Sequence, residues 1–143
     1  MAASTIPSAK AALLAEILAR PALIDVHVAW GIPAELPTDL ERIYVGDAVD
    51  VSREWAGLGG ARLNEDYVLQ VFVETFAGGD DQQTVELRLW TMIAEIEAAV
   101  RADNRLGGLV FVIKPDRVDA KTLPTDSGWA ASATMRFAVE ARM

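Results

Sequence analysis

The chain contains no cysteine and, among its 143 residues, only one histidine and three lysines. The lack of cysteine excludes disulfides, zinc–thiolate sites and cysteine nucleophiles. His27 falls on the polar side of an expected strand with no nucleophile or ligand cluster near it, so we expect it to be structural. None of the lysines lies in a nucleophile motif, and the four tryptophans are expected to anchor the core or an interface. The sequence therefore predicts a protein that is not an enzyme, with no catalytic residue, cofactor or metal.

Basic charge and long apolar runs are also scarce. The net charge of −8 and the pI near 4.6 leave no basic footprint for specific nucleic-acid binding. No apolar run is long enough to cross a bilayer. Lys10, Glu16 and Arg20 interrupt the one early apolar run, which argues against a signal peptide. We therefore expect a protein of a soluble, reducing compartment with no membrane partner.

Carboxylate pairs and a glycine-rich segment are the remaining candidates for a metal site or a phosphate-binding loop. Each pair falls in an expected turn or at a helix N-terminus, where Asp is frequent without any metal. The segment from Arg53 to Asp66 is rich in glycine but lacks the Lys-Ser or Lys-Thr of a phosphate-binding loop, so we predict a surface loop. The three pairs are Asp47 with Asp50, Asp80 with Asp81, and Asp116 with Asp119.

The longest periodic stretch, Asp80 to Gly108, predicts a helix over about residues 82–105. Asp80 and Gln83 fit a capping box at its start. Gly107 can take the left-handed conformation that ends a helix. One stripe at helical spacing is entirely apolar and predicts the face that meets the core. Its members are Val85, Leu89, Met92, Ile93, Ile96, Ala99 and Val100.

The opposite face of this helix is only partly charged. Leu87, Trp90, Ala94 and Ala98 form a second apolar patch there. Two interpretations remain open: a neighbouring loop of the same chain covers the patch, or the patch is a subunit contact, because exposed apolar patches often mark interfaces.

A first helix is expected from Ser4 to Arg20, capped by Ser4 or Thr5 and ended by Pro21. It either docks on the rest of the chain or forms a mobile arm. The apolar run LVFVI at residues 109–113 predicts a central strand buried on both faces. The expected strands span residues 23–30, 43–51, 67–77, 109–114 and 129–141, with 116–125 either an irregular connection or an edge strand.

This order of elements favours the α+β class. We expect a mixed, mainly antiparallel β-sheet packed against the long helix and the N-terminal helix. An apolar fraction of 52% is ample for a folded core. The predicted organisation is an N-terminal helix or arm at residues 1–22 followed by a single α+β domain at residues 23–143.

The order of several short motifs resembles a known family. The motifs are Tyr44-Val45-Gly46, Trp55-Ala-Gly-Leu-Gly with Arg62, Glu65 and Tyr67 after it, the run from Ala94 to Asp103 followed by Leu106-Gly-Gly, and a closing strand that ends in Ala141-Arg-Met. In this order and spacing, the chain resembles the tail-terminator and neck proteins of long-tailed, siphophage-type bacteriophages. The resemblance covers about residues 24–143, and each motif alone is weak.

The resemblance implies a virion protein assembled in the host bacterial cytoplasm. Such a protein forms a ring, typically a homohexamer, that caps the tail tube and joins it to the head-side connector. DNA would pass through the lumen without specific binding, which the net negative charge suits if acidic groups face the channel. Another neck component, such as a head-completion or adaptor protein, and a small cytoplasmic enzyme or ligand-binding domain are the alternatives. The expected subunit-interface residues are Leu87, Trp90, Ala94, Arg53, Trp55 and Arg62.

Overall fold

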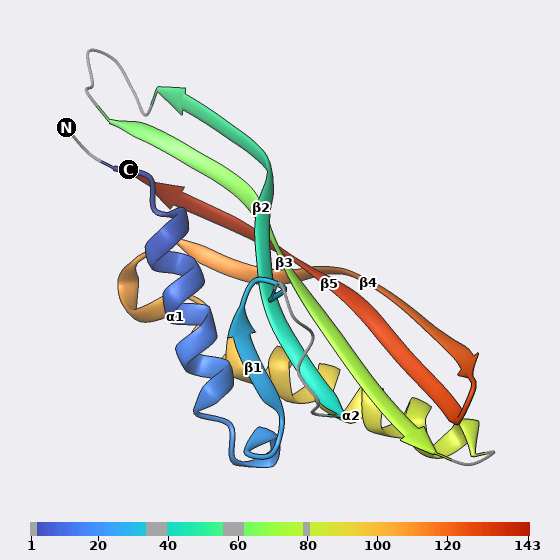
Figure 1. Cartoon of the computed structure of the whole chain (residues 1–143). Helices are drawn as coiled ribbons and strands as arrows, with labels where there is room; N and C mark the ends of the chain where they lie inside the picture. The colour runs from blue at the N-terminus through green and yellow to red at the C-terminus, as the bar shows by residue number, and fades with distance from the viewer. Residues whose placement is uncertain (1–2, 34–39, 56–61, 79–80) are drawn as a thin grey trace.

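The computed structural model describes residues 3–33, 40–55, 62–78 and 81–143. Five strands form one sheet in the order β1-β2-β3-β5-β4 (Figure 1). β1 pairs with β2 in parallel, whereas the other neighbours are antiparallel. With two α-helices, this mixed, mainly antiparallel sheet confirms the α+β class. The bounds are α1 Ile6–Leu18, η1 Pro21–Leu23, β1 His27–Trp30, β2 Glu41–Trp55, β3 Leu63–Gly78, α2 Gln82–Ala102, η2 Leu106–Gly108, β4 Val112–Thr125 and β5 Gly128–Arg142.

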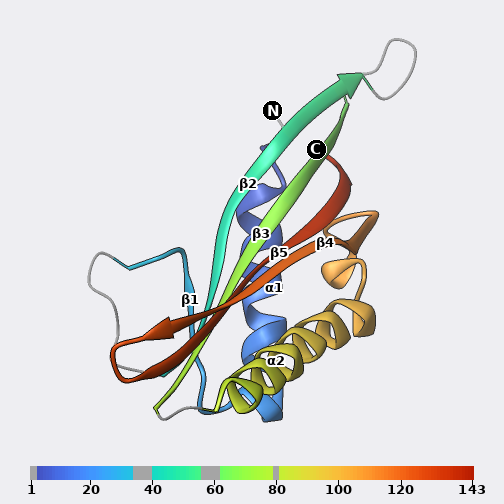
Figure 2. The ribbon, with the colours of Figure 1, turned by 90° about the vertical axis from the view of Figure 1, so that its right-hand side faces the viewer.

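Both α-helices lie on one face of the sheet, and the core fills the space between them and the strands (Figure 2). Every second residue of the middle strands points toward the helices, since side chains alternate between the two faces of a strand. The apolar stripe predicted for α2 is buried in full, and the structure confirms it. The apolar stripe of α2 and the inward-facing side chains of the strands therefore form one core.

The ends of α2 differ from the prediction in detail. The N-cap is Asp81, whose carboxylate accepts a hydrogen bond from the backbone N–H of Thr84 at 3.1 Å. The predicted cap, Asp80, lies outside the described residues. The helix ends at Ala102 instead of near residue 105, because the Asp103 carboxylate accepts the N–H of Gly107 at 2.8 Å in place of a further helical turn. Gly107 is left-handed, with φ of 69°, in the short η2 helix after that end.

The N-terminal helix α1 is docked on the sheet. Ala9, Leu13 and Ile17 are buried in the same core as the strands. At its end, Arg20 forms an ion pair of 2.9 Å with Glu95 on α2. The helix thus contributes to the same core, while the division of the chain at residue 22 stays a prediction.

The glycine-rich segment is not a loop over its whole predicted length. β2 continues to Trp55 and β3 starts at Leu63, with Arg53 opposite Glu65 and Trp55 opposite Leu63. At two register shifts, between Val45 and Ala48 and between Val49 and Ser52, β2 has one residue more than β3, and pairing continues beyond each shift. The prediction of a surface loop from residue 53 to residue 66 is wrong for these flanks because cross-strand pairing overrides their polar composition. Residues 56–61 lie outside the described residues.

The run LVFVI is not a central strand. β4 begins only at Val112 and lies at the edge of the sheet, and Leu109 and Phe111 are exposed. Pro115 does not end the strand: β4 continues to residue 125 past a register shift at Pro115, so the edge-strand alternative is the correct one. An edge strand tolerates proline, since one side of its backbone has no partner.

Docking of α1 is testable by a pair of substitutions on the same helix. Leu13→Ala removes a side chain that is 0% exposed and should lower the free energy of unfolding by about 3 kcal/mol. Leu18→Ala, at a position that is 58% exposed, should change it by less than about 0.5 kcal/mol. Urea unfolding of both variants measures the difference, and equal small effects would contradict docking.

Candidate assembly surfaces

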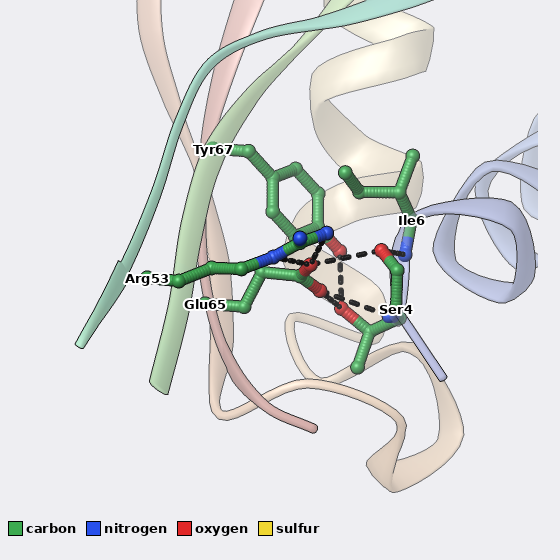
Figure 3. A network of polar contacts seen from close by, with 6 residues as sticks. Ser4, Ile6, Arg53, Glu65 and Tyr67 are labelled. Carbon is green, nitrogen blue, oxygen red and sulfur yellow. Dashed lines mark hydrogen bonds and ion pairs between the residues drawn. The ribbon is translucent and has the colours of Figure 1, made fainter. Parts of the chain in front are cut away.

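A buried carboxylate ties the first residues of the chain to the sheet (Figure 3). Glu65 on β3 is fully buried and accepts hydrogen bonds from the Ser4 hydroxyl at 2.8 Å, the Thr5 backbone N–H at 2.9 Å and the Thr5 hydroxyl at 2.7 Å. Arg53 on β2 adds an ion pair at 2.9 Å. The Tyr67 hydroxyl lies 3.0 Å from the Thr5 hydroxyl. We call Ser4, Thr5, Arg53, Glu65 and Tyr67 the carboxylate clamp.

The clamp keeps Glu65 ionised. Burial alone raises the pKa of Glu65, but hydrogen bonds from Thr5, Ser4 and Arg53 outweigh burial and hold the pKa below its ordinary value. Burial also raises the pKa of Tyr67, and the charge on Glu65 adds to this rise. The clamp thus holds a charged carboxylate beside a neutral phenol at the start of α1.

Beyond the clamp, β2 and β3 form a projecting two-stranded arm (Figures 1 and 2). We define the hairpin arm as residues 51–55 with residues 62–64. Residues 51–55 are all exposed, and Trp55 keeps 68% of its surface in contact with solvent. The arm contains the predicted interface residues Arg53, Trp55 and Arg62, and Arg62 is also exposed. All three residues lie on the arm, where the sequence predicted a loop, and their part in a subunit interface stays a prediction.

The other predicted interface residues lie on α2. Leu87, Trp90 and Ala94, which we call the outer stripe of α2, are exposed, with 61% of Leu87 and 46% of Trp90 in contact with solvent. No loop among residues 3–33, 40–55, 62–78 and 81–143 therefore covers the stripe. Beside Trp90, a groove of about 160 Å³ lies between α2 and the β4 residues 120–122. Figure 1 shows the hairpin arm and α2 at different ends of the molecule, so one chain does not bring the two groups together.

The face of the sheet opposite the helices carries an open depression of about 390 Å³ over β3, β5 and β4. Its carboxylates are already paired: Glu74 lies 3.2 Å from Arg42, and Asp119 lies 3.2 Å from Arg117. His27 is half-buried and meets the Tyr44 ring edge-on with centroids 6.3 Å apart. The side chains named here thus each contact a partner of the same chain.

Two of the three carboxylate pairs lie in strands instead of the predicted turns, whereas Asp81 of the third pair caps α2 as expected for a helix N-terminus. Asp47 and Asp50 lie at the register shifts of β2, where Asp50 has a φ of 52°, and Asp116 lies at the shift in β4. Within residues 3–33, 40–55, 62–78 and 81–143, no group of three or more acidic or histidine side chains is placed to hold a metal ion. No helix in the same ranges is long and apolar enough to cross a membrane.

Glu65 entered the sequence interpretation only as part of the resemblance. A signal for its burial was present, since Glu65, Tyr67 and Leu69 share one side of an alternating strand, and that side is apolar further along. A charged residue in such a position needs partners. The partners Ser4 and Thr5 lie about sixty residues away, so periodicity alone did not identify them.

Comparison with known proteins shows similarity in fold but not in sequence family. The chain matches no family model and no curated protein. Its fold is similar to that of a chain in the virion of a native gene transfer agent particle, with a TM-score of 0.52 and 17% sequence identity. The similarity covers 94% of this chain and 94% of that chain, so the whole architecture is shared.

The clamp predicts a pH dependence of stability. Because the pKa of Glu65 is lowered by folding, its contribution to stability is complete above the unfolded value of 4.5 and is lost as the pH falls through the folded value. Glu65→Gln should therefore lower stability at neutral pH by about 2 kcal/mol and flatten the decline below about pH 5. Urea unfolding from about pH 7 to about pH 3 measures the slope.

The matched control is Asp66→Asn, which alters the adjacent, exposed carboxylate. It should leave the acid slope of the wild-type protein almost unchanged. An identical slope for Glu65→Gln and the wild-type protein would show that the clamp does not control acid stability.

Proposed function

We propose that the chain is a structural virion protein, a tail terminator that forms a homohexameric ring in the neck of a phage-like particle. The ring caps the finished tail tube, stops its growth and joins it to the head-side connector. DNA passes through the lumen without specific binding. In this role the protein needs no catalytic residue and no cofactor.

The observation that carries the proposal is the match over 94% of both chains with a virion chain of a gene transfer agent. Two surfaces of this chain add support, because the hairpin arm and the outer stripe of α2 both expose a tryptophan and lie apart. Two different patches fit a head-to-tail contact, which closes into a ring when its rotation closes. A symmetric dimer would instead use one patch twice.

The projecting hairpins fit contacts along the tail axis. The β2–β3 and β4–β5 hairpins extend past the helices in different directions (Figures 1 and 2). Most of β4 beyond Ile113 is exposed. Such extensions give a ring subunit reach toward a tail tube protein on one side and a connector protein on the other. The net charge of −8 favours passage of DNA, provided that acidic groups line the channel.

Oligomeric state is the first test of the proposal. Native mass spectrometry of the purified protein should give a complex of six 15.4 kDa chains, and negative-stain images should show a ring. A monomer or dimer that retains a small molecule would favour a ligand-binding domain or an enzyme instead. Deletion from a phage-like particle should give overlong tails, whereas particles with tails of normal length that remain unjoined would favour another neck component.

The outer stripe of α2 predicts a substitution that separates assembly from folding. Trp90→Glu places a charge at an exposed apolar position, so the chain should remain folded but fail to form the ring. Circular dichroism measures folding, and native mass spectrometry measures assembly. Ser8→Glu, on the exposed side of α1, is the matched control and should still assemble. Global unfolding of Trp90→Glu would place Trp90 among the residues that the fold itself needs.

A further inference from the structure

In the hairpin arm, the face of the sheet that α1 and α2 cover elsewhere has no helix over it among the described residues. Trp55 lies opposite Leu63, and both are on the side of the sheet that carries Glu65, the side that the helices cover elsewhere. α1 begins at Ile6, next to Glu65, so Trp55 and Leu63 lie beyond its first turn. Among the described residues, no helix covers Trp55, and its indole is largely in solvent.

The outer stripe of α2 is the complementary feature. It is a helical face whose apolar side chains stay exposed, although the β4 residues 120–122 adjoin it across the groove beside Trp90. Charge is complementary as well: exposed Glu86 adjoins the stripe, exposed Arg62 adjoins Leu63, and neither forms an ion pair with the described residues. In the core of this fold, a helix face packs on a strand face, and the hairpin arm and the outer stripe of α2 offer one exposed face of each kind.

We propose that the two halves meet between neighbouring copies: the helix-side face of the hairpin arm, with Trp55 and Leu63, packs on the outer stripe of α2 of the next chain. The second copy thereby continues the helical layer past the start of α1. This inference rests on the proposed ring and specifies its contact. Trp55 and Trp90 are the central anchors, and Arg62 pairs with Glu86 at the rim.

The alternative of strand pairing between copies is less well supported by the edges of the sheet. The two edge strands are β1 and β4. β1 has four residues, and β4 carries Pro115, Pro124 and a register shift. Proline and irregular register hinder pairing at an edge because they remove donors and bend the strand. Packing of the arm face on α2 needs neither edge.

Thiol cross-linking tests the contact, because the chain has no cysteine of its own. In the full chain, Leu63→Cys is combined with Ala94→Cys, which leaves Trp55 and Trp90 in place. A short bis-maleimide should then link neighbouring chains into a ladder up to the full ring, seen on a denaturing gel. Each single-cysteine variant should give no ladder.

Two control pairs locate the contact. Glu54→Cys with Ala94→Cys places the thiol on the opposite face of the same arm, and Leu63→Cys with Ser132→Cys places the second thiol on the sheet face without helices. Both pairs should cross-link at least tenfold less than the Leu63 and Ala94 pair. A ring that cross-links as well through either control pair would overturn the proposed contact while leaving the ring intact.

Shortening one side chain tests how much the contact stabilises the ring. Trp55→Ala should keep the circular dichroism spectrum of the wild-type chain and raise the concentration at which the ring dissociates at least about tenfold, because central aromatic residues dominate interfaces. An unchanged dissociation midpoint in a cross-linkable ring would overturn the role of the arm. Absence of any ring in the wild-type protein would overturn the proposed function itself, and the contact with it.

Discussion

The burial of one ionised carboxylate, Glu65, is the constraint on which the arrangement of this chain depends. A charge taken out of water must be hydrogen-bonded, or folding loses several kcal/mol. The hydrogen bonds come from Ser4 and Thr5 at the start of α1 and from Arg53 on β2. The requirement therefore joins the start of the chain to the paired strands β2 and β3, about sixty residues away from it. It fixes where α1 begins and where the supported part of the sheet ends.

The position of the clamp also separates the molecule into a covered and an uncovered part. On one side of Glu65, α1 and α2 bury the apolar face of the sheet in a continuous core. On the other side, the same face continues into the hairpin arm with Trp55 exposed. A two-stranded ribbon without a core is marginal in water. The proposed contact between copies would cover both this ribbon and the exposed face of α2.

The sequence predicted the helices and strands better than it predicted which strands lie side by side in the sheet. The buried stripe of α2 follows from helical spacing, and β3 and β5 follow from strict alternation, because these signals are local. The predicted central strand at residues 109–113 failed because a short apolar run does not say whether one or two strands will lie beside it. The predicted loop at residues 53–66 failed at its flanks, where Arg53 pairs with Glu65 and Trp55 with Leu63. Polar composition indicated exposure correctly for residues 53–55, which form a strand all the same, but it gave no sign that Glu65 is buried.

By itself, the sequence determined the helix and strand periods, the α+β class, the net negative charge and the buried stripe of α2. It did so because each of these properties depends on residues close together in the chain or on composition. Only the tertiary structure decided the order β1-β2-β3-β5-β4, the edge position of β4 and the partners of Glu65. Those features depend on register and contacts between segments about sixty or more residues apart, such as Ser4 with Glu65 and Asn64 with Arg142. Local propensity carries no information about such pairs, whereas a buried charge does require that a partner exist.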